Sequence, residues 1–276
     1  MNILNMQNDD DLRFEPEKSD VCLVVGGFLM SLSRSELERY DRQLSIRGWG
    51  VNGQRKLKAS KVVVAGVGGL GSVSSIYLAA AGVGRLVLID GDKVSLSDLN
   101  RQILYSEETL GLSKVDMAEM RIKSLNSEVK VESIMNQITE ENVHSLIKDA
   151  DVVVDGLDNW STRFIVNNYC VEKSIPFIHA GVSEFYGQIT TVMPGEGPCL
   201  RCVFPEKPYE MEKIPIFGAT PGVLASMQVM EVIKIITGIG RPLVGRMLFL
   251  DGEEMTCEET EIKRNPNCPV CRSLKS

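Results

Sequence analysis

The chain has 276 residues with a formal net charge of -7, and apolar residues make up 43% of it. This share of apolar residues is enough to form a buried core, which excludes a chain that is disordered throughout. The acidic balance argues against a nucleic-acid partner, because proteins that bind nucleic acid usually carry a basic face. The longest apolar run, residues 21–30, is too short to span a bilayer, and residues 1–20 are too acidic for a secretory signal. We expect no membrane contact and a cytoplasmic protein with reduced thiols.

The first 33 residues differ from the rest of the chain. Acidic and polar residues dominate their start, and they follow neither a helical nor a strand period. We expect residues 1–33 to be an N-terminal extension that is disordered, or a segment upstream of a natural start at Met30. Residues 34–276 are then expected to form a single domain.

A helix is predicted to begin directly after this extension. Two overlapping capping boxes occur there, one formed by Ser33 with Glu36 and the other by Ser35 with Glu38. In such a box the serine hydroxyl and the acidic side chain each accept a hydrogen bond from a backbone N–H of the first helical turn.

From residue 61 onward, strand and helix patterns alternate. The predicted strands cover residues 61–65, 85–90, 131–134, 151–155, 176–180 and 188–193. The predicted helices cover residues 72–81, 114–126, 163–173 and 221–237. Residues 195–217 and 240–276 follow no period and are expected to be irregular. This alternation predicts a Rossmann-like α/β fold, with a mostly parallel, mixed sheet and helices on both faces.

A glycine-rich loop follows the first of these strands. Gly66, Gly68, Gly69 and Gly71 fit the pattern G-x-G-x-x-G, and Asp90 ends the next strand. Glycines allow backbone N–H groups to approach a phosphate at a helix N-terminus, and the carboxylate can bind ribose hydroxyls. The pattern predicts a nucleotide site, against the alternative of a turn that serves only packing. An NAD(P)-dependent Rossmann oxidoreductase would use the same loop.

Three cations and one acid outside the loop favour a triphosphate. Arg42, Arg101 and Lys114 exceed what a hydride-transfer site needs, and they suit the neutralisation of a leaving pyrophosphate. Asp158 follows a buried strand, where its carboxylate is placed to hold Mg²⁺ or, alternatively, to cap the following helix.

Four of the seven cysteines form two C-x-x-C pairs, Cys199 with Cys202 and Cys268 with Cys271. Together they offer the four thiolates of a closed, structural Zn²⁺ site that would tie the C-terminal segment to the catalytic body. The alternatives are free thiols or a redox-active pair, but neighbouring prolines favour loops over the helix start of a redox motif.

No catalytic nucleophile is evident among the remaining candidates. Cys170 falls in a helical pattern and is expected to be a core residue, and His179 is expected to pack at a strand end. Neither forms a recognisable Cys/His or Ser/His pattern, so covalent catalysis by a side chain is poorly supported.

Taken together, these motifs resemble the ThiF/MoeB/HesA family, the bacterial relatives of ubiquitin-activating enzymes. The resemblance covers about residues 34–275 and rests on motifs that recur in one order: Arg39-Tyr40-x-Arg42-Gln43, the glycine loop, Asp90-x-Asp92, Leu99-Asn100-Arg101-Gln102, Gly111-x-x-Lys114, Asp155-x-x-Asp158-Asn159-x-x-x-Arg163, Gly218-Ala219-Thr220-Pro221-Gly222-Val223 and the two cysteine pairs.

The resemblance implies a homodimeric adenylyltransferase that binds ATP over the glycine loop. It implies a role for Gly69 and Asp90 in nucleotide binding, for Arg101 and Lys114 in holding the phosphates, and for Asp158 in holding magnesium. Asn100 and Asn159 belong to the same nucleotide-binding motifs, and Arg42 resembles an arginine that enters the site from the neighbouring subunit.

The substrate implied by the resemblance is a ubiquitin-like sulfur-carrier protein that ends in Gly-Gly. Its terminal carboxylate would attack the α-phosphate of ATP to give an acyl-adenylate and pyrophosphate, and a separate sulfur donor would then attack the adenylate. The molybdopterin, thiamine and cysteine pathways all stay open. Adenylation of a carboxylate on modified tRNA and a non-catalytic, zinc-stapled binding subunit are alternatives that the charge and the phosphate-handling residues disfavour.

Two positions depart from the family pattern. The family usually has Asn-Leu-Asn/Gln-Arg where this chain has Asp98-Leu99-Asn100-Arg101, and we expect Asp98 to turn outward or to touch magnesium. Some members carry a cysteine in the loop ahead of Gly218 for a covalent link to the carrier, but residues 203–217 contain none. This absence favours a simple adenylyltransferase without a covalent relay through that loop.

Overall fold

A computed structural model of the chain describes residues 24–25, 28–29, 31–211 and 213–273. Most of the predicted N-terminal extension, residues 1–33, therefore lies outside the described residues. The described part of it includes two short strands, β1 (Val24–Val25) and β2 (Phe28–Leu29), which pair with each other.

Helix α1 (Arg34–Arg39) begins where the first capping box predicts it. The Oγ of Ser33 accepts a hydrogen bond from the N–H of Glu36, and the Glu36 carboxylate accepts one from the N–H of Ser33 at 2.7 Å. The second box is wrong as a helix start, because Ser35 already lies inside α1.

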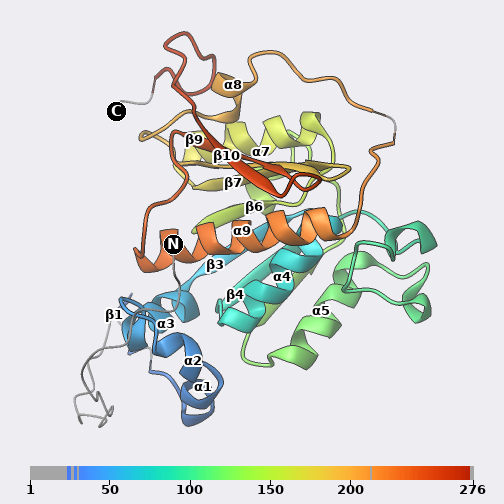
Figure 1. Cartoon of the computed structure of the whole chain (residues 1–276). Helices are drawn as coiled ribbons and strands as arrows, with labels where there is room; N and C mark the ends of the chain where they lie inside the picture. Colours follow the sequence, from blue (N-terminus) through green and yellow to red (C-terminus); the bar gives the residue numbers. More distant parts are fainter. Residues whose placement is uncertain (1–23, 26–27, 30, 212, 274–276) are drawn as a thin grey trace.

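A mixed sheet of eight strands forms the centre of the molecule, in the order β10-β9-β8-β7-β6-β3-β4-β5 (Figure 1). In chain order its strands are β3 (Lys61–Ala65), β4 (Arg85–Ile89), β5 (Lys130–Ile134), β6 (Val152–Asp155), β7 (Phe177–Ser183), β8 (Tyr186–Val192), β9 (Arg246–Asp251) and β10 (Thr256–Glu261). Strands β3 to β7 pair with one another in parallel, whereas β8 pairs antiparallel with β7 and β9, and β10 pairs antiparallel with β9. The predicted mixed, mostly parallel sheet is thus confirmed at the level of topology.

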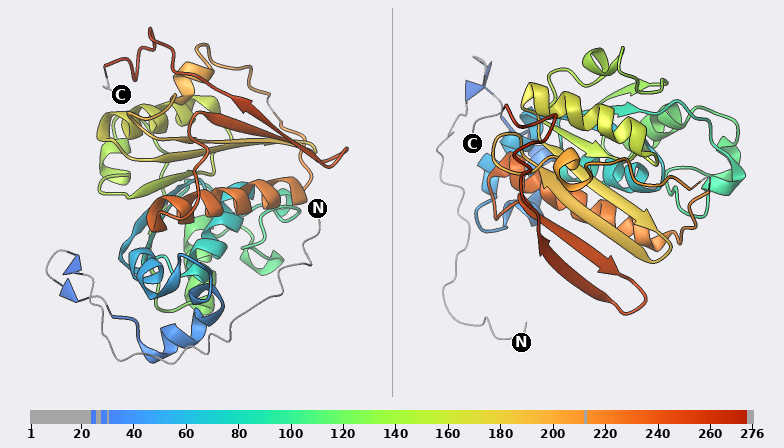
Figure 2. Two further views of the ribbon diagram at one scale, coloured as in Figure 1. Left: turned by 60° about the vertical axis from the view of Figure 1, so that its left-hand side comes forward. Right: turned by 90° about the horizontal axis from the view of Figure 1, so that it is seen from above.

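Helices cover both faces of the sheet (Figures 1 and 2). The helices are α2 (Asp41–Leu44), α3 (Gly50–Ala59), α4 (Gly69–Ala81), α5 (Lys114–Leu125), α6 (Val143–Leu146), α7 (Trp160–Lys173), α8 (Leu200–Val203) and α9 (Ala219–Thr237), with 3₁₀ turns η1 (Leu96–Asp98) and η2 (Glu107–Thr109). On β3, Val62 and Val64 face the core under α4, α5 and α9, while Val63 and Ala65 face the core under α7. A central strand buried on both faces explains the uninterrupted apolar run that predicted it.

Helix α9 is long and apolar enough, by length and composition alone, to cross a membrane, with a mean hydropathy of 1.3 over its apolar window. Its side chains Leu224, Ala225 and Val232 are fully buried in the core cluster, and the helix packs against α4, β7 and β8. Packing inside the fold therefore accounts for its apolar composition.

The prediction of irregular structure for residues 240–276 is wrong in part, because β9 and β10 form a hairpin there. Every residue of β10 is exposed, and among the strands that the structure describes it pairs only with β9, at the sheet edge. Its sequence, Thr-Cys-Glu-Glu-Thr-Glu, shows no alternation of apolar and polar residues, since neither of its faces is buried.

Candidate functional site

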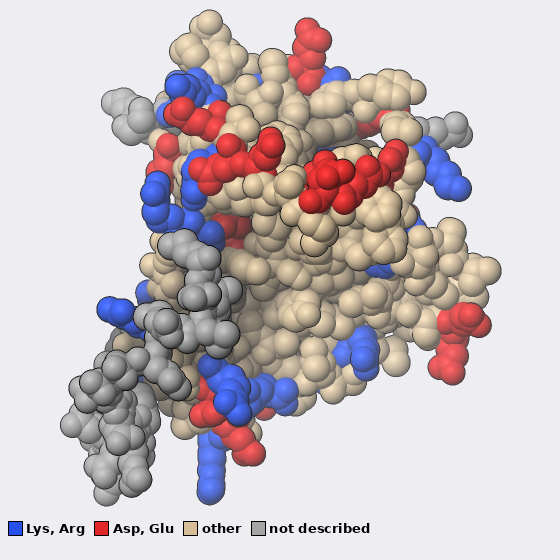
Figure 3. All heavy atoms as spheres, in the orientation of Figure 1, with Lys and Arg blue, Asp and Glu red and all other residues tan. Residues whose placement is uncertain are grey.

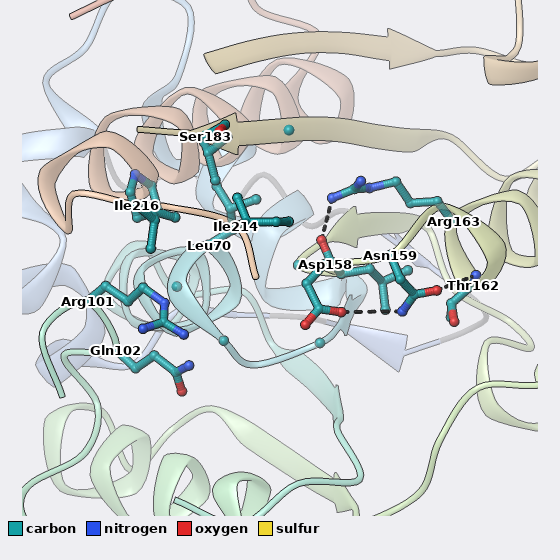
Figure 4. A pocket seen from close by; sticks show the side chains of 18 of the residues that line it. Leu70, Arg101, Gln102, Asp158, Asn159, Thr162, Arg163, Ser183, Ile214 and Ile216 are labelled. Carbon is teal, nitrogen blue, oxygen red and sulfur yellow. Dashed lines mark hydrogen bonds between the residues drawn. The ribbon is translucent and has the colours of Figure 1, made fainter. Parts of the chain in front are cut away.

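A cleft of about 1460 Å³ opens where the parallel strands β3, β4 and β6 end. The carboxyl ends of such strands are where ligands bind in open α/β sheets. The cleft exceeds the roughly 300–1,000 Å³ of a typical small-molecule pocket, so it has room for a nucleotide and a second substrate. Part of its wall is shown in Figure 4.

The glycine loop forms the floor of this cleft. Gly66 has φ +88°, and a Cβ there would lie 2.6 Å from the carbonyl oxygen of Gly156. Gly68 and Gly69 line the cleft, and α4 starts at Gly69, where no side chain of the described residues caps its N-terminus. The first backbone N–H groups of α4 are thereby left to a ligand, an arrangement that fits phosphate.

Gly71 has a different role from the one predicted. It does not line the cleft, and it is buried under the loop, where a Cβ would lie 1.9 Å from the carbonyl oxygen of Gly66. Only glycine permits this close approach of α4 to the loop, so Gly71 serves packing and not direct nucleotide contact.

Asp90 lies at the end of β4 with its carboxylate fixed by two backbone groups. Oδ2 accepts a hydrogen bond from the N–H of Val67, and Oδ1 accepts one from the N–H of Asp92, both at 2.8 Å. Burial raises the pKa of Asp90 above its ordinary value, although these bonds and Lys114 oppose the rise. The side chain is held in one orientation, as a ribose-binding carboxylate requires.

Arg101 and Lys114 both line the cleft, and Asp98 lies between them. The guanidinium of Arg101 is 3.5 Å from Oδ1 of Asp98, and the ammonium of Lys114 is 3.6 Å from Oδ2. Lys114 also contacts the exposed Asp92 at 3.2 Å. The side-chain oxygen of Asn100 accepts a hydrogen bond from Arg101 at 2.8 Å.

The structure corrects the expectation that Asp98 turns outward, whereas its contact with magnesium stays a prediction, since Asp98 also lines the cleft. Asp98 is buried, and its carboxylate accepts hydrogen bonds from Ser95 and from the side chain of Gln102. Burial opposes ionisation of Asp98, but the Ser95 N–H, Lys114 and Arg101 outweigh it and lower its pKa. Asp98 therefore holds two cations in place, and Gln102, a cleft residue absent from the predicted set, holds Asp98.

Asp158 is exposed in the cleft just beyond β6, and Figure 4 shows it across the cleft from Arg101. The alternative that Asp158 caps α7 is wrong, because Asn159 is the cap and accepts a hydrogen bond from the N–H of Thr162 at 2.9 Å. The amide of Asn159 also donates to Asp158 at 3.3 Å. A free, oriented carboxylate oxygen beside a phosphate cradle fits a Mg²⁺ ligand.

Arg42 is, after Gly71, the second residue of the predicted nucleotide site that does not line the cleft. It is exposed on α2, and it is not among the residues that line the cleft.

The four predicted zinc ligands come together although 65 residues separate the two pairs in the sequence. Their sulfur atoms all lie within 4.8 Å of one another, with separations of 3.9 Å (Cys199–Cys202), 3.6 Å (Cys199–Cys268) and 3.3 Å (Cys202–Cys271). Tetrahedral zinc with Zn–S bonds of about 2.3 Å separates sulfurs by roughly 3.8 Å, so the cluster fits this ion. Burial raises the pKa of Cys202 to about 11, so a bound cation would have to displace its proton.

Two further groups, which were not predicted as site residues, reach the cleft through Arg163 and Glu210. Buried Asp155 accepts hydrogen bonds from Arg163 at 2.8 Å and from His179 at 2.7 Å, which places His179 in a polar network and not merely in apolar packing. Glu210, on the loop between α8 and α9, accepts a hydrogen bond from the N–H of Trp160 at 2.6 Å. The family motif that contains Asp155 and Arg163 is a sequence signal for the first group. No such signal marks Glu210, because the loop between α8 and α9 has no periodic pattern.

Comparison with known proteins agrees with this geometry. The model of the ThiF family matches residues 40–270. The chain is 41% identical to "Protein HesA, vegetative" of Trichormus variabilis, over 88% of this chain and 92% of that protein. It is 39% identical to "Sulfur carrier protein adenylyltransferase" of Thermus thermophilus, over 88% and 93%. The crystal structure of Escherichia coli MccB with ATP superposes with a TM-score of 0.77 at 28% identity, over 87% of this chain and 75% of that chain. The chain therefore belongs to the ThiF family, and it is an adenylyltransferase.

Proposed function

We propose that the chain uses ATP to adenylate the C-terminal Gly-Gly carboxylate of a ubiquitin-like sulfur-carrier protein. The observation that carries this proposal is the convergence of a glycine cradle, two cations held by Asp98 and the exposed Asp158 carboxylate on one cleft. A cleft of this size also leaves space for a peptide tail beside the nucleotide.

The reaction forms one bond and breaks one. An oxygen of the carrier's carboxylate attacks the α-phosphorus of ATP, and the bond between the α-phosphorus and the β-bridging oxygen breaks to release pyrophosphate. The carboxylate is ionised at neutral pH, so the site needs no general base. Arg101 and Lys114 neutralise the charge that accumulates on the leaving pyrophosphate, and positioning supplies the rest. Mg²⁺ held by Asp158 would add a Lewis acid at the phosphates.

The loop ahead of α9 supports a simple adenylyltransferase. Residues 203–217 contain no cysteine, so no thiol is available there to form a covalent link with the carrier. Sulfur from a separate donor protein would attack the acyl-adenylate directly. A carrier of the molybdopterin or thiamine type is the proposed substrate, and the cytoplasm the proposed location.

We also propose a homodimer, each subunit with one adenylation domain over residues 34–276. A groove of about 490 Å³ runs between α4 and α9 and shares Arg101 with the cleft. Exposed apolar side chains border it, with exposed fractions of 52% for Tyr77, 46% for Val223 and 60% for Met230. Figure 3 shows a broad uncharged area over these two helices. Such a surface is typical of a subunit interface.

The test is ATP–pyrophosphate exchange against a panel of purified small carriers ending in Gly-Gly. We expect exchange that requires both Mg²⁺ and the terminal carboxylate, and that is lost when the last glycine is removed. Tight NAD binding without ATP turnover would contradict the proposal and favour an oxidoreductase.

A further inference from the structure

His179 lies between Asp155 and Gln188 in a polar network behind the cleft. Its side chain is fully buried, with Nδ1 2.7 Å from Oδ2 of Asp155 and Nε2 3.2 Å from Nε2 of Gln188. Gln188, unlike His179, lines the cleft. The network therefore joins the buried end of β6 to a side chain that a substrate can reach.

The partners of Asp155 determine the proton position on His179. The Asp155 carboxylate also accepts hydrogen bonds from Nε of Arg163 at 2.8 Å and from the N–H of Leu157 at 3.0 Å. A carboxylate paired with a guanidinium only accepts, so Nδ1 of His179 must carry the proton that it donates. Burial lowers the pKa of His179 and outweighs the opposing effect of Asp155, which is consistent with a neutral ring. Nε2 then carries no proton, and its lone pair needs a hydrogen-bond donor.

Gln188 can satisfy this lone pair in one orientation only. Its amide nitrogen must point to His179, which leaves Oε1 as the group offered to the cleft. Among the described residues, no hydrogen-bond partner of Oε1 is present. The cross-strand neighbour of Gln188 is Gly181, where a Cβ would lie 3.3 Å from the amide nitrogen. Glycine at this position leaves the amide the room that the orientation requires.

This acceptor lies at the opposite end of the cleft from the nucleotide cradle. In the sheet, β8 is three strand spacings from β3, which corresponds to about 14 Å. The charged groups Asp90, Arg101 and Lys114 lie near the cradle end. The lining residues Tyr186, Gly187 and Phe249 on β8 and β9 are uncharged, as are Ile214, Pro215 and Ile216 on the loop ahead of α9, which also contributes Lys213. A stretch of lining in which uncharged residues predominate suits a peptide tail better than phosphates.

We propose that His179 is a positioning residue that orients Gln188, so that Oε1 of Gln188 accepts a hydrogen bond from a main-chain N–H of the carrier's tail. This inference rests on the proposed function, since it concerns how the same cleft holds its second substrate. Asp155, His179 and Gln188 form a chain of hydrogen bonds. Asp155 therefore affects substrate binding only by orienting His179, and His179 only by orienting Gln188.

The first measurement requires no substrate. We expect the side-chain nitrogen NMR shifts of His179 to report a neutral ring with Nδ1 protonated and Nε2 unprotonated at pH 7. The chain has two histidines, so a His179→Phe variant assigns the signals. If that variant does not fold, His144→Gln assigns them equally well. A proton on Nε2 would overturn the inference, because Gln188 would then turn its amide nitrogen to the cleft.

The second measurement is a double-mutant cycle in the exchange assay. Gln188→Met removes the acceptor and should raise KM for the carrier about tenfold, with KM for ATP unchanged. His179→Phe should have a similar effect, and the double variant should be no worse than Gln188→Met alone. The control is Lys93→Met, at an exposed position outside the cleft lining, which should leave KM for the carrier unchanged.

An unchanged KM for the carrier in Gln188→Met, or additive losses in the double variant, would overturn the inference. If none of the carriers tested supports ATP–pyrophosphate exchange by the unmodified enzyme, it is the proposed function that fails. The NMR measurement still decides the orientation of Gln188.

Discussion

Asp98 shows how one buried acid organises the charge of the site. Arg101 and Lys114 would repel each other if they approached alone, and a carboxylate between them removes this cost before substrate binds. These three side chains carry a net charge of +1, although Asp92, which also lines the cleft, pairs with Lys114 as well. A triphosphate therefore meets cations that are already oriented, which is the arrangement that electrostatic catalysis requires.

The first prediction concerns the two residues that face each other across the cleft. Arg101→Ala and Asp158→Ala should each lower the rate of pyrophosphate exchange by about 100-fold or more, because each removes a charge that stabilises the transition state. The fold should persist, since both side chains border solvent. Lys93→Ala, an exposed cation outside the cleft lining, is the matched control and should keep full activity. A fully active Arg101→Ala/Asp158→Ala double variant would contradict the site assignment.

The second prediction concerns Glu36 at the start of α1. Its buried carboxylate pairs with Lys58 at 2.7 Å. Burial opposes ionisation, but Lys58 and the Ser33 N–H outweigh it and lower the pKa of Glu36 from 4.5. A lowered pKa contributes stability above pH 4.5, and this contribution is lost as the pH falls through the folded-state value.

Glu36→Gln should therefore lower the free energy of unfolding by about 2 kcal/mol at pH 7, and by less as the pH drops below about 4. Urea denaturation across this pH range measures the difference. A gap between the two proteins that stays constant with pH would show that the charge of Glu36 is not responsible.

At the scale of single residues, the sequence predicts contacts between neighbours in the chain well and contacts between distant side chains poorly. Ser33 and Glu36 lie three residues apart, so their reciprocal hydrogen bonds follow from helix geometry alone. The role of Asp98 depends on Lys114, which comes from a different element, and sequence spacing gives no sign of that contact.

At the scale of elements, the loop between α8 and α9 is tied to the start of α7. Glu210 accepts hydrogen bonds from the N–H groups of Trp160 and Ser161, and Lys207 pairs with Glu210 at 2.8 Å. A carboxylate at a helix N-terminus satisfies free N–H groups and interacts well with the helix dipole. The loop is thereby held over the cleft beside Asp158.

The third prediction is that Glu210→Ala loosens this loop. The free energy of unfolding should fall by roughly 1 kcal/mol, and trypsin should cleave faster after the exposed Lys213. Gel electrophoresis over a digestion time course measures the cleavage rate. Glu206→Ala, at an exposed position on the same loop, should digest as the unmodified protein does. Equal cleavage rates for all three proteins would show that Glu210 does not hold the loop.

The fourth prediction concerns the cysteine cluster, which joins α8 to the C-terminal segment. Purified protein should contain about one zinc per chain, and a strong chelator or Cys268→Ser should lower the melting temperature markedly, because ligand binding to the folded site is folding free energy. Cys257→Ser, at an exposed position on β10, is the control and should keep both metal and stability. Protein with no metal and the same melting temperature after chelation would contradict a zinc site.

Element prediction from sequence succeeds where burial imposes a period. The strands from β3 to β8 and the helices α4, α5, α7 and α9 all match predicted segments within a few residues. Hairpin β9–β10 was missed because its outer strand is exposed on all sides, so hydrogen bonding to β9 and not burial defines it. Helix α3 was missed because Gly50 and Gly53 dilute its pattern.

At the scale of the whole molecule, the cleft and the α4–α9 face share a boundary at Arg101. The strand order sets β8, which carries the proposed contact for the carrier's tail, three strands away from β3 and its glycine loop, and the sequence alone does not predict this order. The same fold leaves Arg42 outside the cleft, so any catalytic role for Arg42 has to come from a second subunit.

The fifth prediction tests this directly by complementation. Arg42→Ala and Asp158→Ala should each be inactive as pure homodimers. When equal amounts are mixed and allowed to exchange subunits, about half of the dimers are mixed, and each mixed dimer holds one site with both residues intact. Activity should then recover to about a quarter of the unmodified enzyme. Met230→Glu on the Asp158→Ala chain places a charge in the proposed interface and should abolish this recovery. If Arg42 instead acted within its own chain, every mixed dimer would carry one defect per site, and the mixture would stay inactive.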